Sequence, residues 1–275
     1  MSGLRCCLIS AAFALATTPV IHGQLLGARP EVELHHALAE FDQAQELLPQ
    51  NPARARRFLQ SSAQRMHSLI AAGIRNGYLE YNLGNCYLLA GDVGRAILHY
   101  RRAQQWIPRD PLLADNLREA RARCLVQIPP TRTSTVLRSV FFWHYDTAVA
   151  GRAALALVGY VSFWGLLALA MTTHRRWATV LTIAVGALAA ALACSVAITQ
   201  WSQRNQPPGV VTAMDVSVQK GPGAQYQRRF EQPLQPGVEF TVLERRGAWW
   251  RILLPDGQSG WVDSTAAELV PDGSA

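Results

Sequence analysis

The fold is decided by two uncharged stretches, AALALVGYVSFWGLLALAM at residues 153–171 and WATVLTIAVGALAAALACSVAITQW at residues 177–201. They contain 19 and 25 residues, and a helix of about 20 apolar residues crosses a bilayer. Helices that pack on a soluble core show a polar stripe, and neither stretch has one. We therefore predict transmembrane helices at residues 151–172 and 177–201, in preference to two helices buried in a soluble core.

The connection between the two predicted helices, residues 172–176, is so short that the helices must form a hairpin. Arg175 and Arg176 in this connection favour its placement on the cytoplasmic side, although Arg152 and Arg204, just outside the other ends of the two uncharged stretches, weaken that preference. Both uncharged stretches lack the ionisable side chain that an ion or proton pathway needs. The sequence therefore argues against a transporter or a channel.

The N-terminus gives a second, independent indication of orientation. Arg5 precedes an apolar run at residues 6–16 that has the length of a signal peptide. We predict a signal peptide at residues 1–23, with cleavage after Ala16 or Gly23, and an uncleaved anchor is the alternative. In either case the chain is exported up to the first predicted helix, so both soluble parts lie on the outer face of the membrane.

The composition limits the classes of function. The chain has 275 residues, a net charge of +7 and 49% hydrophobic residues, but only 16% charged residues, whereas ordinary soluble domains have about 25%. This combination argues against a disordered chain and against a single soluble domain. Lys220 is the only lysine and the arginines are scattered, so we expect no nucleic-acid partner.

The segment before the hairpin, residues 32–125, is predicted to be a helical domain. Its apolar residues recur with helical spacing, and Pro52 and Pro108 interrupt the pattern. Gly91 and Asp92 form the turn between the two best-defined helices. The helices are predicted at residues 33–48, 53–72, 78–90, 93–106 and 111–124.

Two of these helices carry small and large residues at a fixed spacing, which places them at a common contact: Leu83, Gly84, Tyr87, Ala96, Tyr100, Ala103 and Pro108. This pattern resembles a tetratricopeptide repeat that spans residues 77–110. Glu80 departs from the pattern, which usually has tryptophan there. A second copy begins 34 residues later but then fails, so we expect residues 111–124 to be a capping helix.

The resemblance to a tetratricopeptide repeat implies a concave surface that binds an extended peptide or a partner protein. In the family this surface is lined by the first helix of each pair. The groove residues implied by position are Tyr78, Tyr81, Asn85 and Leu88. The alternative is that these four are ordinary surface residues.

The C-terminal segment, residues 206–275, changes to short alternating runs separated by turn residues. Residues 255–257, Pro-Asp-Gly, form a strong hairpin turn. We expect the strands to close into a small all-β barrel. They are predicted at residues 210–214, 216–218, 239–244, 249–254 and 260–262.

Several short motifs follow one another in this segment: VSV and KGPG within residues 216–223, Tyr226, WWRI at residues 249–252 and GWV at residues 260–262. Their order resembles bacterial SH3-like domains. The resemblance implies an aromatic ligand groove, and Tyr226 and Trp249 are predicted to form it. The alternative is that the tryptophans pack in the core, which we favour for Trp250 and Trp261.

No catalytic or metal-binding arrangement stands out in the sequence. The chain has no Cys-x-x-Cys, His-Glu-x-x-His or Gly-x-Ser-x-Gly motif. His35 and His36 point to different faces of a helix, so they make a poor metal site. We therefore predict a protein that is not an enzyme and has no cofactor and no metal.

Three cysteines, Cys86, Cys124 and Cys194, remain after the predicted signal peptide. Cys194 lies in a predicted transmembrane helix. Cys86 and Cys124 could form a disulfide outside the cytosol. We favour the alternative of two buried thiols.

The chain is thus predicted to be a multidomain protein: a helical domain, a linker at residues 126–150, a membrane hairpin and a β domain. This order resembles the BatE-type proteins of aerotolerance (Bat) operons. The resemblance implies a multi-pass protein of the bacterial inner membrane with its soluble domains in the periplasm. It also implies von Willebrand factor A-domain Bat proteins as partners and, through them, a MoxR-type ATPase.

These observations predict a non-enzymatic scaffold that is embedded in the lipid bilayer and holds two interaction modules near one membrane surface. A role in aerotolerance or envelope stress follows from the family resemblance alone. The alternative is an envelope anchor whose SH3-like domain binds peptidoglycan.

Overall fold

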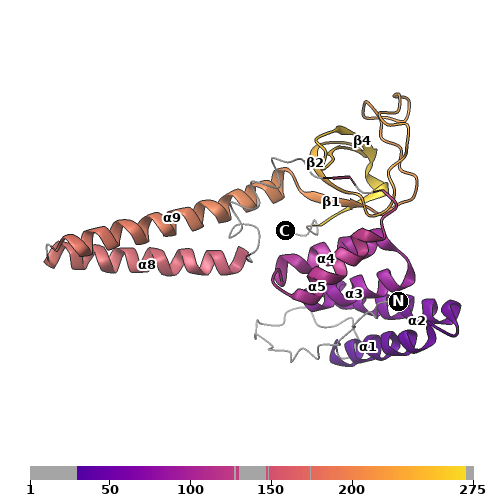
Figure 1. Cartoon of the computed structure of the whole chain (residues 1–275), viewed down its shortest axis with the longest axis horizontal. Coiled ribbons are helices and arrows are strands. Elements are labelled where there is room, and N and C mark those ends of the chain that lie inside the picture. Colours follow the sequence, from indigo (N-terminus) through magenta and orange to yellow (C-terminus); the bar gives the residue numbers. More distant parts are fainter. Residues whose placement is uncertain (1–29, 127, 130–146, 148, 174, 271–275) are drawn as a thin grey trace. The chain divides into compact units, whose positions relative to one another are not determined.

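The computed structural model describes residues 30–126, 128–129, 147, 149–173 and 175–270 (Figure 1). The predicted signal peptide and most of the predicted linker lie outside the described residues. The chain divides into two compact units, Met1–Ile74 and Arg75–Ala275.

The described part of the first unit is a pair of helices, α1 (Pro30–Leu47) and α2 (Pro52–Ala71), close to the predicted bounds. α2 begins where the Asn51 side chain accepts a hydrogen bond from a backbone N–H of the first turn. Apolar side chains of both helices are buried, and the Ser62 hydroxyl donates to the Ala37 carbonyl at 2.7 Å. The helical spacing of the apolar residues therefore identified a genuine packed pair.

Three further helices open the second unit: α3 (Gly77–Ala90), α4 (Val93–Trp106) and α5 (Pro111–Ala122). α3 ends at Gly91, whose φ of 90° lies in the left-handed region that glycine adopts readily. Each helix begins after a residue whose side chain accepts a backbone hydrogen bond. These capping residues are Asn76, Asp92 and Asp110.

The two long apolar helices of the second unit are α8 (Val149–Thr173) and α9 (Arg176–Asn205). They pack together closely. A Cβ added at Gly186 of α9 would lie only 2.8 Å from the Phe163 ring of α8, so glycine allows this close contact. By length and composition, both helices are able to cross a membrane.

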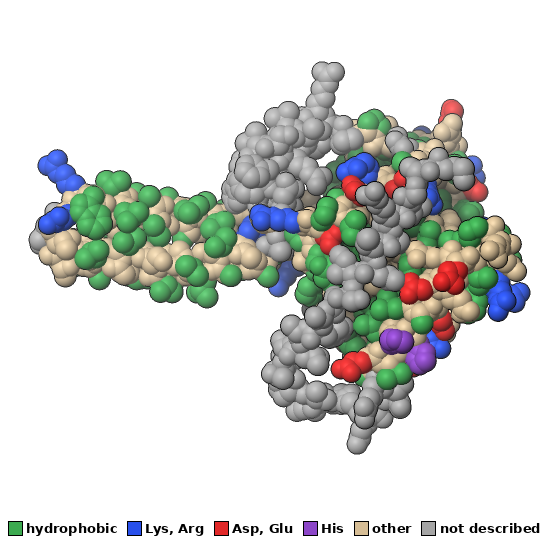
Figure 2. Space-filling view, turned by 60° about the horizontal axis from the view of Figure 1, so that its bottom comes forward, with side chains coloured by type: hydrophobic (Ala, Val, Ile, Leu, Met, Phe, Trp, Pro, Cys, Tyr) green, Lys and Arg blue, Asp and Glu red, His purple; other side chains and the backbone are tan. Residues whose placement is uncertain are grey.

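The outer surface of the α8–α9 pair is apolar. Figure 2 shows hydrophobic side chains along both helices. In the most apolar stretch of 18 residues in α8 no residue is buried, and in the corresponding stretch of α9 17% of the residues are buried. A helix in the core of a soluble protein would be mostly buried, so the described residues do not support that alternative. Exposed large side chains here include Leu157, Val161, Trp164, Val180 and Leu188.

Among the described residues, one charged side chain is enclosed in this pair, that of Arg152. Arg152 lies in the first turn of α8, and its side chain is 4% exposed. Its guanidinium donates a hydrogen bond to the Ser195 hydroxyl of α9. The contact holds the beginning of α8 against the second half of α9, as an antiparallel arrangement requires.

The C-terminal strands form one antiparallel sheet in the order β4-β3-β2-β1-β5. The predicted turn at residues 255–257 joins two of these strands, and a short 3₁₀ helix, Ser264–Ala266, precedes the last one. The strands are β1 (Pro208–Val211), β2 (Glu239–Arg246), β3 (Trp249–Leu253), β4 (Ser259–Asp263) and β5 (Ala267–Leu269).

Three details of the predicted β domain are corrected. Residues 216–218 form no strand; Val216 makes an isolated bridge to Leu234, within the long connection between β1 and β2. β5 has only three residues, too few for an alternating pattern to reveal it. The outer strands β4 and β5 do not pair with each other, so the described strands form an open sheet, not a closed barrel.

Candidate interaction surfaces

A close contact joins α3 and α4. Gly84 faces the ring of Tyr100, and an added Cβ at Gly84 would overlap that ring. Tyr87 and Pro108 are partly exposed. The other residues assigned from the spacing to this contact are fully buried: Leu83, Ala96, Tyr100 and Ala103.

Glu80 departs from the repeat pattern and has a buried partner. Its carboxylate lies 2.7 Å from Nδ1 of His99, and both side chains are almost fully buried. The Tyr87 ring stacks on the His99 ring, with the centroids 5.2 Å apart. A polar pair therefore occupies the place where the resembled pattern has tryptophan.

The four residues predicted to line a groove do not form an open surface. Tyr81, Asn85 and Leu88 are buried, and only Tyr78 is partly exposed. The Asn116 amide on α5 donates to the Tyr81 hydroxyl at 2.8 Å and to Asn85 Oδ1 at 2.9 Å. In this conformation α5 occupies the space beside the predicted groove residues.

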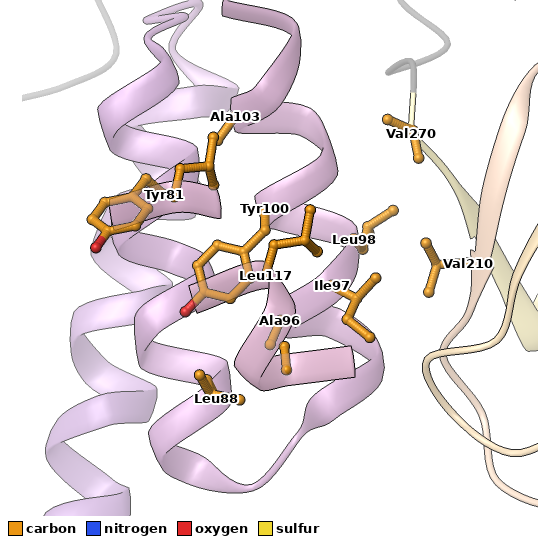
Figure 3. Close-up of a cluster of buried hydrophobic side chains, with 12 residues drawn as sticks. Tyr81, Leu88, Ala96, Ile97, Leu98, Tyr100, Ala103, Leu117, Val210 and Val270 are labelled. Carbon is orange, nitrogen blue, oxygen red and sulfur yellow. The ribbon is translucent and has the colours of Figure 1, made fainter. Parts of the chain in front are cut away.

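The helices α3–α5 and the sheet share one hydrophobic core, which the sequence did not predict. Val210 of β1 and Val270, which follows β5, are buried and cluster with residues of the helices. Figure 3 shows these two valines opposite Ile97 and Leu98 of α4. The local patterns give no signal for this contact, because the α8–α9 hairpin separates the helices from the sheet along the chain.

Arginines of the helices bind the sheet around this shared core. Nε of Arg121 donates to the Glu239 carboxylate at 2.7 Å, and Nε of Arg101 lies 3.2 Å from the same carboxylate. Arg102 donates to the Leu269 carbonyl at 2.9 Å. Charge-assisted hydrogen bonds are stronger than neutral ones. Helices α3–α5 and the sheet therefore form one packed body, here called the helix–sheet body.

The Cys124 thiol lies inside this junction. Gly237, with a φ of 97°, approaches it so closely that an added Cβ would overlap the sulfur. Burial raises the pKa of the Cys124 thiol to about 11, and the Glu239 carboxylate acts in the same direction. The described residues contain no disulfide between Cys86 and Cys124.

A recess of about 370 Å³ lies beside the junction. Most of its lining is apolar, and Arg101 and Glu239 supply the charged groups. Such a lining could bind an apolar side chain of a ligand or partner that has a polar group beside it. The apolar side chains that line it include Phe240, Leu253, Leu254, Pro255 and Val270.

The aromatic residues of the sheet domain differ in exposure. Tyr226 is 46% exposed and Trp249 is partly exposed. No ring contact joins these two among the residues that the structure describes. Trp261 is buried, and Trp250 packs partly buried against the core of the sheet. The two residues predicted for a ligand groove are both accessible to solvent, but they do not form a joined aromatic platform.

In the part of the chain that the structure describes, no group of three or more His, Cys, Asp or Glu side chains could hold a metal ion. No protein-family model, curated protein or solved structure matches the chain. The residues and contacts of the chain itself therefore carry the functional inference.

Proposed function

We propose that the protein is a membrane-anchored scaffold whose helix–sheet body docks a partner protein. The observation that carries this proposal is the shared core, in which Val210 and Val270 of the sheet pack among helical residues. Two modules on a flexible connection would each bind alone, whereas a packed pair presents one surface of fixed geometry. The recess beside the junction offers that surface a place for an apolar side chain of the partner.

The α8–α9 hairpin is the anchor in this proposal. No acidic residue occurs between Asp146 and Asp215, and the Arg152 side chain is enclosed against Ser195. An exported N-terminus then places the helix–sheet body on the outer face of the membrane, which is the periplasmic face of a bacterial inner membrane. The hairpin holds the body near the lipid and raises its effective concentration for other membrane proteins.

We extend the proposal to the family that the order of segments resembles. A compact helix pair with the spacing of a tetratricopeptide repeat, an apolar hairpin and a sheet of short strands with SH3-like motifs support a BatE-type protein. The partners would then be von Willebrand factor A-domain Bat proteins, with a MoxR-type ATPase engaged indirectly. The physiological role would be aerotolerance or resistance to envelope stress.

Chemical crosslinking of the full chain in native membranes, followed by purification and mass spectrometry, tests the docking function. The wild-type protein is expected to recover a reproducible set of membrane proteins. Glu239→Arg places a third cation beside Arg101 and Arg121, so it is expected to lower recovery about tenfold by opening the junction. Glu231→Arg makes the same charge change at an exposed position in the β1–β2 connection and is the matched control.

Two outcomes would contradict the docking proposal. Equal recovery by Glu239→Arg and the wild type would mean that the partner needs only the helices or only the sheet. Recovery of cell-wall fragments without any protein partner would instead favour a peptidoglycan anchor, with Tyr226 and Trp249 as the first residues to test.

A further inference from the structure

We propose that the turn between β2 and β3 binds the anionic headgroups of the same membrane. This surface, here called the β2–β3 tip, consists of Arg245, Arg246, Gly247, Ala248 and Trp249. None of these residues lines the recess at the helix–sheet junction. The inference rests on the proposed role of α8–α9 as the membrane anchor and adds a second contact with the lipid.

The connection between α9 and the sheet is short. α9 ends at Asn205 and β1 begins at Pro208, so only two residues lie between them. The apolar span ends at Ser202, and the start of β1 is therefore at most about 15 Å from the end of that span. The polar layer of a bilayer is about 5–8 Å thick on each side. The sheet thus begins in or just outside the headgroup layer.

The register of β2 places the β2–β3 tip on the side of the sheet where α9 ends. β2 runs antiparallel to β1, so it returns toward the end at which α9 enters the sheet. The backbone N–H of Val242 still bonds to the Pro207 carbonyl at 3.0 Å. β2 then continues through an irregularity at Val242/Glu244 to Arg246, which adds about 13 Å of strand. The β2–β3 tip therefore lies at the end of the sheet where the chain leaves α9.

The side chains of the tip have the chemistry of a headgroup site. Arg245 and Arg246 are exposed, and Trp249 is partly exposed. The Arg245 guanidinium lies 5.7 Å from the Trp250 ring centroid, and that of Arg246 lies 5.5 Å from the Trp261 centroid. Stacking on a ring holds a guanidinium in place, and the N–H groups that it does not use elsewhere, such as the Nη1 and Nη2 groups of Arg246, can donate to phosphate oxygens. Tryptophan favours the membrane interface, so this combination fits a phospholipid headgroup.

The charge around the tip has the sign that an anionic surface requires. Glu244 binds Arg246 at 2.6 Å and lies 4.0 Å from Arg251. Asp263 pairs across the strands with Trp249. Arg204, in the last turn of α9, adds a further cation on the membrane side. With Arg245 included, four arginines accompany two carboxylates among the described residues of this region, so its net charge is positive.

The opposite end of the sheet supplies an internal control. The turn at residues 255–258 joins β3 and β4, and antiparallel pairing places it at the other end of β3 from Trp249. It contains Asp256 and no basic residue. Lipid that approaches from the α9 side should reach the β2–β3 tip and not this turn.

The test is lipid photocrosslinking of the full chain in nanodiscs of phosphatidylcholine alone or with phosphatidylglycerol, in which the lipids carry a photoactivatable group on the headgroup in one set and on the acyl chain in another. Mass spectrometry is expected to find label on residues 245–251 and none on residues 255–258, with less label at high salt. The double change Arg245→Gln with Arg246→Gln should lower the label about fivefold or more, because each basic residue contributes substantially at an anionic surface. Arg228→Gln with Arg229→Gln removes the same charge from exposed positions of the β1–β2 connection and should leave the label unchanged.

The outcomes separate this inference from the proposed anchor. Label on α8 and α9 but not on the tip would overturn the inference and leave the anchor intact. Absence of label on α8 and α9 would contradict the anchor itself. The inference would also fail if both arginine pairs lowered the label equally, if phosphatidylcholine alone sufficed, or if the tip crosslinked to a protein partner in native membranes.

Discussion

The α3–α4 and α8–α9 helix pairs both pack through a glycine that faces an aromatic ring, but the exposure of their other apolar side chains differs. In the first, Gly84 admits the ring of Tyr100; in the second, Gly186 admits the ring of Phe163. The remaining apolar side chains differ, since those of α3 and α4 are mostly buried and those of α8 and α9 are mostly exposed. The contact between two helices therefore depends on a few small residues, whereas the outer face indicates whether water or lipid surrounds the pair.

The polar contacts of the two pairs also differ. α3–α4 encloses the Glu80–His99 pair and the hydrogen bond from the Tyr100 hydroxyl to Asn85. The α8–α9 contact with a charged group is Arg152 to Ser195, near the beginning of α8. A charge at the centre of a bilayer is costly, and one near a helix end is less so. This difference agrees with the proposal that α8–α9 lies in lipid.

The largest effect is expected for Gly84→Leu, because the new side chain would occupy the position of the Tyr100 ring. Overpacking such a contact should lower the free energy of unfolding of the helix pair by about 3 kcal/mol. Hydrogen exchange of the backbone amides of α3 and α4 in the detergent-solubilised full chain measures this loss. Partner recovery should fall with it.

The control for Gly84→Leu is Asn82→Leu, which places the same side chain at a partly exposed position of α3. It should leave amide protection nearly unchanged. If Gly84→Leu retains the amide protection of the wild type, then the contact with Tyr100 does not hold the pair together.

A smaller effect is expected for Gly186→Leu in the second pair. The obstructing atoms belong to the Phe163 side chain, which can rotate away, and lipid can fill the opened space. We expect a loss of about 1 kcal/mol, seen as slower migration on SDS gels because a separated hairpin binds more detergent. Gly165→Leu is the matched control, since nothing lies within 4 Å of its added Cβ; equal shifts would refute the contact.

Effects of similar or smaller size are expected when one polar contact is removed from each pair. Tyr100→Phe loses the bond to Asn85, which still accepts from Asn116, and should reduce stability by about 1 kcal/mol. Ser195→Ala should cost about 0.6 kcal/mol, the usual value for a polar contact between membrane helices. Amide exchange in α4 and at the beginning of α8 measures both, and a larger loss for Ser195→Ala would reverse the comparison.

The ends of α3 and the start of α4 could be predicted because their causes are local. Asn76 and Asp92 cap α3 and α4 through neighbouring backbone N–H groups, and Gly91 ends α3. The spacing also identified Gly84 and its surroundings, since residues three and four positions apart share a helix face. The enclosure of Arg152 could not be predicted, because its partner Ser195 lies 43 positions away on α9.

The predicted groove shows where a local pattern is insufficient. Position within the repeat placed Tyr81, Asn85 and Leu88 on an open face, yet all three are buried. Asn116 of α5 bonds to the first two. A capping helix was predicted, but its place beside these residues depends on packing between helices that are not adjacent in sequence.

The sequence by itself determined the helices, the apolar hairpin and most strands, because each follows from the period of apolar residues and from residues that end an element. Only the tertiary structure decided that Val210 and Val270 complete the core of the helices, and that Glu239 meets Arg101 and Arg121. The physical reason is that an alternating pattern shows which side of a strand avoids water. It does not show which other surface of the chain covers that side.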